Sequence, residues 1–390
     1  MFWRNLRFFP ISTPEETTMK FTVNSTELQR ALNKVGGAIP SKSTIPILES
    51  FLFDLVNDVL TITATDLDVS LTTSIQVKGL EDGRIAVPAK RLVDTVRSLP
   101  PDVSPDFAID TTTNKIKIST NSGEYTLTGE STKEFPSLPQ FTGSDAIRLD
   151  ATLMKRLVHR TAFAVSTDEL RPAMMGILLQ GKGSELRAVA TDGHRLVQID
   201  QRLPGVDALK RDVIVPARAF HLVARSLESG VCVIAVNNTH IKVAFDSTQL
   251  ISRLIDEKYP NYDSVIPLDN DKVMTIDRES TVTSLRRVAL YASATTHQVR
   301  FEIKKSTVTI SAQDIDFGGE ARETMPCSYD HDTLEIGFNS NYVVDILTHL
   351  ESEKVVFKFS SPTRAGIVAP AEQKEDETVI MLVMPVRLNT

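Results

Sequence analysis

Apolar and polar residues alternate along three stretches of the chain, and each stretch runs into an aspartate. The stretches are LTITATDLDVSLT (60–72), RAVATDGHRLVQ (187–198) and VTISAQDIDFGGE (308–320). A period of two places successive side chains on opposite faces, which is typical of a half-buried β-strand. The aspartates Asp66, Asp192 and Asp314 stand 126 and 122 residues apart, so the pattern predicts one unit that occurs three times.

Helical segments recur in step with these strands. A strand running into a helix is predicted over 85–99, 213–227 and, more loosely, 335–350. A second helix is predicted upstream of each unit, over 25–35, 152–163 and 278–289, and the first of these carries an apolar stripe at helical spacing. The sequence therefore predicts an α+β fold of three similar tandem domains, at 19–143, 144–270 and 271–390. Residues 1–18 are expected to form a disordered N-terminal extension.

The composition is that of a globular protein, with 41% hydrophobic and 24% charged residues. Two cysteines, Cys232 and Cys327, occur without a CxxC motif, which excludes a disulfide framework and suits a reducing cytosol. The longest apolar run, 379–386, is far shorter than the roughly 20 residues that span a bilayer. We therefore expect no membrane association.

The distribution of charge along the chain says more about possible partners than the net charge does. The formal net charge is −7, yet the six predicted helices together carry +9, which leaves −16 on the rest of the chain. If the helices share one side of an assembly, they form a positive track that faces a polyanion. Contacts to backbone phosphates carry no sequence preference and weaken with salt. The charge pattern therefore favours a non-specific binder of double-stranded DNA.

Signals for an enzyme are weak. Asp192 and His194 could form an acid/base pair, but the other two copies keep the aspartate and lack the histidine, which favours an aspartate that caps a turn. The stretch GILLQGKGS nearly matches a phosphate-binding loop, but Gly183 stands where a hydroxyl is needed, so a hairpin tip is favoured. We predict no catalytic residue, no metal and no cofactor. A hydrolase that uses Asp192 and His194 is the alternative.

Seven motifs, in this order and spacing, resemble the beta subunit of the bacterial replicative DNA polymerase, the sliding clamp. They are MKFTV (19–23), TIPIL (44–48), AVPAKRL (86–92), VATDGHRL (189–196), YPNY (259–262), EIGFNSNYVVDIL (335–347) and VMPVRL (383–388). The resemblance implies a DNA clamp fold, with two helices packed on antiparallel sheets in each domain. It also implies a ring-shaped head-to-tail homodimer that encircles duplex DNA and tethers polymerases as a processivity factor. The expected localisation is cytoplasmic and nucleoid-associated, in a bacterium.

The resemblance also implies particular site residues. The DNA-facing positions are Lys42, Lys90, Arg91, Lys155, Arg156, Arg171, Arg218, Arg286 and Arg287. A pocket for the peptide motifs of partner proteins would comprise Met174, Thr191, Gly193, His194, Arg195, Leu196, Pro260, Val265, Asn339, Tyr342, Val383, Met384, Pro385, Val386, Arg387 and Leu388. At the dimer interface, Tyr125 and Leu127 would meet Leu290 and Tyr291.

The implied partners are the clamp loader, DNA polymerases and other replication and repair proteins that carry clamp-binding peptides. Thr296 and Ser264 depart from residues common in the family, and the departures concern peptide selectivity. A monomeric scaffold that binds peptides without encircling DNA is a second alternative.

Overall fold

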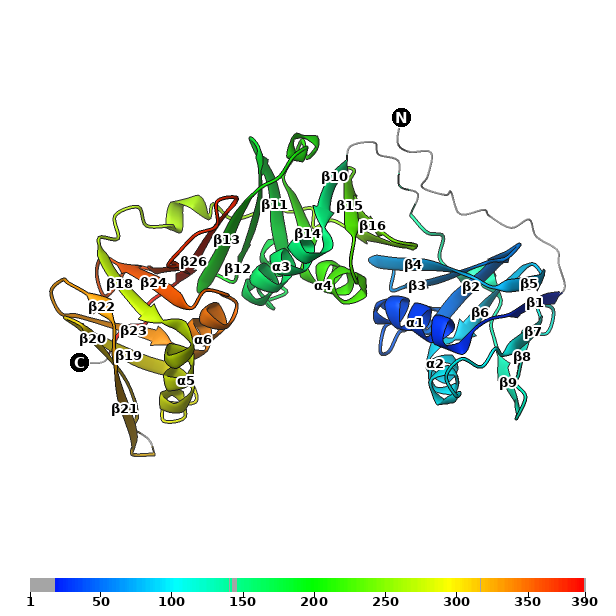
Figure 1. Cartoon of the computed structure of the whole chain (residues 1–390), viewed down its shortest axis with the longest axis horizontal. Helices are drawn as coiled ribbons and strands as arrows, with labels where there is room; N and C mark the ends of the chain where they lie inside the picture. Colours follow the sequence, from blue (N-terminus) through cyan, green and yellow to red (C-terminus); the bar gives the residue numbers. More distant parts are fainter. Residues whose placement is uncertain (1–17, 140, 142–145, 316, 389–390) are drawn as a thin grey trace. The chain divides into compact units, whose positions relative to one another are not determined.

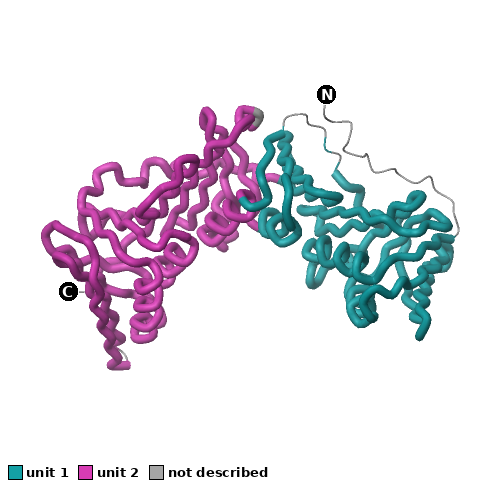
Figure 2. Tube along the Cα trace, viewed as in Figure 1, with its two compact units in different colours: residues 1–152, 218–253 teal, residues 153–217, 254–390 magenta. Residues whose placement is uncertain are grey.

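The computed structural model describes residues 18–139, 141, 146–315 and 317–388 (Figure 1). The predicted N-terminal extension lies outside the described residues, apart from Thr18. The chain forms two compact units, one of residues 1–152 and 218–253 and the other of residues 153–217 and 254–390 (Figure 2). This division passes through the predicted middle domain, and the three predicted boundaries stay predictions.

Unit 1 contains two antiparallel sheets. The eight-stranded sheet has the order β10 (Ala146–Asp150), β15 (Val231–Val236), β16 (His240–Phe245), β17 (Thr248–Arg253), β4 (Val69–Gln76), β3 (Val59–Thr65), β2 (Ser50–Val56) and β6 (Gly83–Pro88). The five-stranded sheet has the order β5 (Lys78–Glu81), β1 (Thr18–Thr22), β7 (Asp106–Asp110), β8 (Lys115–Ser119) and β9 (Glu124–Thr128). The helices are α1 (Ser25–Val35), α2 (Ala89–Ser98) and α4 (Ala217–Ser226), of which Ala217 belongs to unit 2.

Unit 2 likewise contains one large and one smaller antiparallel sheet. Its nine-stranded sheet has the order β14 (Val213–Pro216), β11 (Gly176–Lys182), β12 (Glu185–Thr191), β13 (Arg195–Arg202), β26 (Glu377–Val383), β25 (Gly366–Pro370), β24 (Lys354–Phe359), β18 (Lys272–Asp277) and β22 (Ser328–Tyr329). The four-stranded sheet has the order β21 (Gly319–Pro326), β20 (Thr307–Asp314), β19 (Gln298–Lys304) and β23 (Leu334–Asn339). The helices are α3 (Ala151–Thr161), whose first two residues belong to unit 1, α5 (Arg278–Ala289) and α6 (Ser340–Thr348).

The three predicted upstream helices are confirmed to within two residues at either end, and the three segments predicted as a strand running into a helix are β6 and α2, β14 and α4, and β23 and α6. Helix α1 begins where the Asn24 side chain accepts hydrogen bonds from the backbone N–H groups of Thr26 and Glu27, at 2.9 and 3.2 Å. These bonds satisfy N–H groups that have no partner inside the helix. Its apolar stripe, which includes Leu28 and Leu32, is at most 2% exposed. The helix is therefore held by a buried face as well as by its cap.

Antiparallel sheets continue across the boundaries between repeats. Strand β17 of the second repeat pairs with β4 of the first, with Thr248 opposite Thr73. In the same way β13 of the second repeat pairs with β26 of the third, with Arg195 opposite Val383. Adjacent repeats are thus joined by backbone hydrogen bonds. None of the helices in the described part of the chain is long and apolar enough to cross a membrane.

Candidate functional site

The stretch that carries Asp192 and His194 is a tight turn between β12 and β13. Asp192 Oδ1 accepts hydrogen bonds from the backbone N–H groups of His194 and Arg195, at 2.8 and 2.9 Å. In the first repeat Asp66 accepts two such bonds from its own turn, at 3.1 and 2.8 Å. The aspartate therefore caps a repeated turn, as predicted from the sequence.

Arg195 is the centre of this site. Its Nε atom lies 3.1 Å from Asp192 Oδ2, Nη1 donates to Asp345 Oδ2, and Nη2 donates to the carbonyl of Phe163 at 2.7 Å. The guanidinium carbon also lies 5.1 Å from the centre of the Phe163 ring and 5.0 Å from that of Tyr342. Both distances fit cation–π contacts. Arg195 therefore uses its planar group to join β13 to the helix α6 and to the segment after α3.

Aromatic rings continue the cluster on both sides of Arg195. The His194 ring stacks on Tyr342 with 5.6 Å between ring centres. The His349 ring stacks on Phe163 at 4.0 Å and lies 4.5 Å from His159. Burial lowers the pKa of His349, and the nearby His159 adds to the effect. The His194 ring faces Tyr342, and the Asp192 carboxylate is engaged by its own turn and by Arg195, so this geometry does not assemble an acid/base pair.

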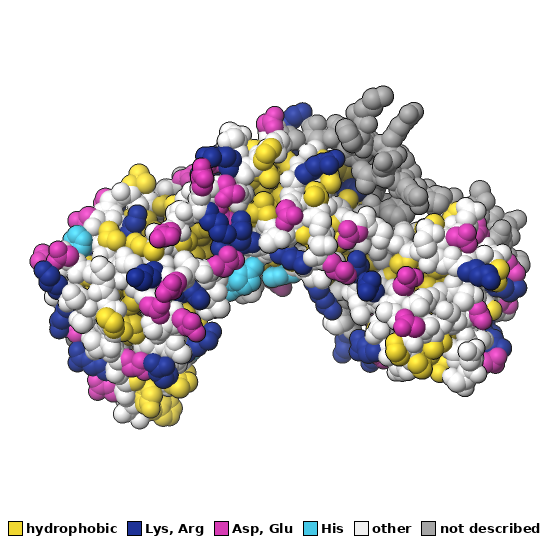
Figure 3. Space-filling view, in the orientation of Figure 1, with side chains coloured by type: hydrophobic (Ala, Val, Ile, Leu, Met, Phe, Trp, Pro, Cys, Tyr) yellow, Lys and Arg dark blue, Asp and Glu magenta, His cyan; other side chains and the backbone are white. Residues whose placement is uncertain are grey.

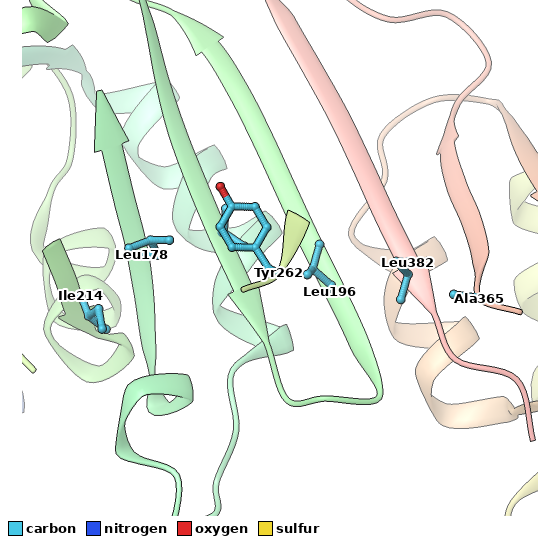
Figure 4. Packing of buried hydrophobic residues seen from close by; sticks show 7 residues of the cluster. Leu178, Leu196, Ile214, Tyr262, Ala365 and Leu382 are labelled. Carbon is cyan, nitrogen blue, oxygen red and sulfur yellow. The ribbon is translucent and has the colours of Figure 1, made fainter. Parts of the chain in front are cut away.

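A buried apolar cluster packs beside the turn between β12 and β13. It contains Leu178, Val189, Leu196, Ile214, Tyr262, Ala365 and Leu382, with Tyr259 and Ile266 packed against it. Figure 4 shows the Tyr262 ring lying among the strands of the large sheet. The Tyr262 hydroxyl donates to Gln180 Oε1 at 2.5 Å, and desolvation raises its pKa. The YPNY segment is thus anchored through its second tyrosine.

The C-terminal segment is fastened to the same turn. The Met384 N–H donates to the His194 carbonyl at 2.8 Å, and the Val386 N–H donates to the Gly337 carbonyl at 2.9 Å. Met384 is 39% exposed and Val265 is 50% exposed, so both present apolar surface to solvent. Contacts and strand pairing bring together a core of the predicted pocket: Thr191, Gly193, His194, Arg195, Leu196, Tyr342, Val383 and Met384.

The remaining predicted pocket residues lie on neighbouring segments. Met174 lies in the 3-10 turn Pro172–Met175, and Asn339 caps α6 by accepting from the Asn341 N–H at 3.0 Å. A Cβ atom at Gly337 would lie 2.7 Å from the Leu388 side chain, so Leu388 packs on that strand. Pro260 precedes the anchored Tyr262, while Pro385 and Arg387 flank Val386.

Three residues of this cluster were missed by the sequence reasoning: Asp345, Phe163 and His349. A spacing of three along α6 places Tyr342 and Asp345 on one helix face, and that spacing was the available signal. Arg171, predicted to face DNA, lies at the turn between β12 and β13: its Nη1 atom is 3.4 Å from the Asp192 carbonyl. Gly193 has φ of +90°, and a Cβ there would lie 3.2 Å from Arg171 Nη1.

The other predicted DNA-facing residues differ in their exposure and in whether they form ion pairs. Lys42, Lys90, Arg91 and Arg286 are exposed and have no ion-pair partner within the described residues. Arg218 pairs with Asp66, and Arg287 pairs with Glu323 at 2.6 Å. Lys155 is half-buried. Figure 3 shows basic and acidic side chains interspersed on the face that it draws.

Arg156 is held inside unit 2. Its side chain is 19% exposed and its Nη2 atom lies 3.0 Å from Glu377 Oε2. The same nitrogen donates to Gln201 Oε1 at 3.3 Å. The carboxylate of Glu377 neutralises much of the charge on Arg156, so Arg156 would attract a phosphate less strongly than an unpaired arginine. That Arg156 faces DNA stays a prediction.

The predicted interface residues lie beside free sheet edges. Tyr125 is 39% exposed and Leu127 is 7% exposed on β9, the edge strand of the five-stranded sheet. Leu290 and Tyr291 are 81% and 47% exposed after α5. A Cβ at Gly319 would lie 3.4 Å from the Tyr291 ring, which places Tyr291 beside β21, the edge strand of the four-stranded sheet.

Three tandem α+β repeats, with six α-helices and antiparallel sheets among the described residues, define the class of DNA clamps. Models of the DNA polymerase III beta subunit match the chain in order. The N-terminal domain matches residues 19–139, the central domain residues 148–261 and the C-terminal domain residues 263–387.

Relatives and solved structures agree with these matches. The beta sliding clamp of Pseudomonas aeruginosa is 31% identical over 375 residues, which cover 95% of this chain and 100% of that protein. The beta sliding clamp of Chlamydia muridarum is 30% identical over 382 residues, with the same coverage. A crystal structure of the Bartonella birtlesii clamp bound to griselimycin has a TM-score of 0.90 at 30% identity, covering 95% of this chain and 100% of that one.

The chain belongs to the DNA polymerase III beta subunit family, the bacterial sliding clamps. It is a processivity factor for DNA replication, and the family has no catalytic activity of its own. The hydrolase alternative built on Asp192 and His194 is therefore dropped.

Proposed function

We propose that this clamp acts as a head-to-tail homodimer, closed into a ring around duplex DNA in the bacterial cytoplasm, at the nucleoid. Each chain would contribute three domains, 19–143, 144–270 and 271–390. A clamp loader would open the ring, and polymerases and repair proteins would be held through their peptide motifs. The proposal rests on family membership together with two free sheet edges, β9 in unit 1 and β21 in unit 2.

Pairing of β9 with β21 of a second chain would close each junction of the ring. Edge strands present unpaired N–H and C=O groups, which are a template for pairing with another chain. Tyr125 would then meet exposed Leu290 and Tyr291, and the pairing would bury apolar surface. Ile315 and Phe317, which are 79% and 89% exposed in the turn between β20 and β21, would extend the same contact.

The duplex would be held weakly by exposed cations. Lys42, Lys90, Arg91 and Arg286 have exposed charges available for phosphates. Phosphate contacts carry no sequence information, so they can be exchanged as the ring slides. Residence on DNA would then depend on ring closure, because an encircled duplex can leave only at an end.

The surface around Arg195 would receive the peptides. Thr191, His194, Tyr342 and Met384 surround the turn that Arg195 stabilises. Apolar walls suit Leu or Phe anchors, which supply much of the affinity in such pockets. The single observation that carries this proposal is the Arg195 guanidinium, which joins β13, α6 and Phe163 in one rigid cluster.

The ring is tested by solution mass and by retention on DNA. Light scattering over a dilution series should give about 86 kDa, twice the chain mass of 43.1 kDa. After loading, the clamp should stay on circular duplex DNA and slide off a linear duplex of equal length. A mass of one chain at every concentration, with equal loss from both DNAs, would leave a monomeric peptide-binding scaffold in its place.

The pocket is tested by calorimetric titration with griselimycin, which is bound to the Bartonella clamp. Arg195→Ala should abolish binding, because the cluster around Tyr342 loses its centre. Arg364→Ala is the matched control, since the ion pair of Arg364 within the described residues is with Asp269, at the surface of the same unit. Equal affinity in all three proteins would reject this location for the pocket.

A further inference from the structure

One face of the nine-stranded sheet in unit 2 carries a row of polar side chains next to the apolar cluster. Gln180 on β11 lies opposite Arg187 on β12, and Arg187 lies opposite Asp200 on β13. Side chains an even number of positions apart point to the same face of a strand, so the row shares its face with Leu178 and Leu196 of the cluster (Figure 4). Asp200 is 9% exposed, so its carboxylate needs partners inside the protein.

Arg187 uses all three nitrogens of its guanidinium in this row. Its Nε and Nη2 atoms lie 2.5 and 3.1 Å from the two carboxylate oxygens of Asp200, which is a bidentate contact. Its Nη1 atom donates to the Tyr262 hydroxyl at 3.4 Å and lies 3.7 Å from Asp263 Oδ1. The Tyr262 hydroxyl in turn donates to Gln180 at 2.5 Å. Because the guanidinium is planar, the bidentate contact with Asp200 also fixes the direction in which Nη1 points.

Tyr262 is the buried anchor of a turn whose neighbouring residues reach solvent. Its side chain and backbone are 6% exposed, whereas Pro260 and Val265 are exposed. The Tyr262 N–H donates to the Pro260 carbonyl at 2.8 Å, and the Val265 N–H donates to the Tyr262 carbonyl at 3.1 Å. These backbone bonds join Tyr262 directly to the two residues of this segment that the resemblance assigns to the peptide pocket. The position of Tyr262 therefore sets the position of both.

We propose that Arg187 is a positioning residue for the peptide pocket, which acts by fixing the turn that presents Pro260 and Val265. The inference rests on the proposed function and adds a residue that lies outside the pocket positions implied by the resemblance. Burial of the Tyr262 ring is non-directional, whereas the hydrogen bonds at its hydroxyl depend on angle, so these bonds orient the turn. A turn that is ordered before the peptide arrives loses less conformational entropy on binding, which raises the affinity.

The test measures griselimycin affinity by calorimetry on the whole clamp, beside the free energy of unfolding in urea. Arg187→Lys keeps a cation next to Asp200 and loses the planar group that reaches Tyr262. Tyr262→Phe keeps the buried ring and loses the hydroxyl. Each variant should weaken binding by about fivefold, because the turn must then be ordered when the ligand binds. The double variant should bind little more weakly than either single one, since both changes remove the same contact.

Arg160→Met is the control for lost stability. Arg160 is a buried residue of the same unit, and its ion pairs are with Glu377 and Glu351 rather than with the turn. This control should lower the free energy of unfolding and leave the affinity for griselimycin at the wild-type value. Hydrogen exchange gives a second readout. Backbone amides of residues 259–266 should exchange faster, relative to the rest of unit 2, in Arg187→Lys and Tyr262→Phe and not in the control.

Weaker binding in both single variants, without a further loss in the double variant and with an unchanged control, would establish the positioning role. Wild-type affinity in Arg187→Lys and Tyr262→Phe would overturn it, even when Arg195→Ala abolishes binding and the pocket stands. Affinities that fall with stability in all variants, the control included, would also overturn it, because Arg187 would then act only by stabilising the fold. If wild type itself does not bind griselimycin, the pocket is refuted, and this inference with it.

Discussion

Removing one partner of the buried ion pair between Arg160 and Glu377 should destabilise unit 2 severely. Their side chains are 3% and 2% exposed, and Arg160 Nη1 lies 2.5 Å from Glu377 Oε1. Glu377→Gln leaves two arginines, Arg160 at 3% and Arg156 at 19% exposure, facing a buried neutral amide. Breaking a buried pair in this way costs about 3 kcal/mol, roughly a 150-fold change in the folding equilibrium. The outer contact of Arg160, to Glu351, adds little because Glu351 is 55% exposed.

A double-mutant cycle measures the interaction energy between Arg160 and Glu377 separately from the other contacts of the two side chains. Arg160→Met should cost somewhat less than Glu377→Gln, because Arg156 still neutralises Glu377 at 3.0 Å. The double variant should be less destabilised than the two single effects added together, with a coupling of about 2 kcal/mol. Urea unfolding gives the free energies, and hydrogen exchange of peptides from α3 and β26 shows where protection is lost. Griselimycin affinity should change little, since the pairing of β13 with β26 stays in place.

If Arg160→Met and Glu377→Gln each lower the free energy of unfolding by less than about 0.5 kcal/mol, this reasoning is refuted, because solvent would then reach the ion pair and screen it. The reasoning is also refuted if the two single losses of stability add up to that of the double variant, because the loss in Arg160→Met would then come from the packing of the arginine stem.

Three further outcomes follow from the described contacts. Arg195→Lys should weaken griselimycin binding by roughly 30-fold, about 2 kcal/mol, because an ammonium cannot reach its three acceptors at once; calorimetry measures this. Leu290→Asp should convert the dimer to 43.1 kDa chains at micromolar concentration, whereas Leu268→Asp, 99% exposed in the same unit, should leave the dimer intact by light scattering. Acid should destabilise unit 2, because burial lowers the pKa of His349 below its value in the unfolded chain, so the unfolded state binds the proton first as the pH falls through about 6.5. His349→Gln should shrink the difference in Tm between pH 7.5 and pH 5.5, and an unchanged difference would mean that other groups cause it.

Local patterns were predictable from the sequence, and long-range pairings were not. The stripe of α1 and the repeated cap of Asp66 and Asp192 depend on residues a few positions apart, so spacing alone identified them. Arg195 and Asp345 are 150 positions apart, and no local pattern indicates that they meet. Arg156 shows the limit of counting charges, because a basic residue on a helix can point into the protein and pair with a carboxylate from another repeat.

The continuous sheets carry a consequence for how such a chain can change over evolutionary time. Where β17 meets β4 and β13 meets β26, the repeats are joined through N–H and C=O groups that every residue except proline possesses. A joint of this kind places few demands on side-chain identity. The repeats can therefore drift apart, as TDLD, TDGH and QDID have done, while the joints keep their geometry. One copy of the turn was thereby free to acquire the residues of the proposed peptide pocket without disturbing the architecture that the three copies share.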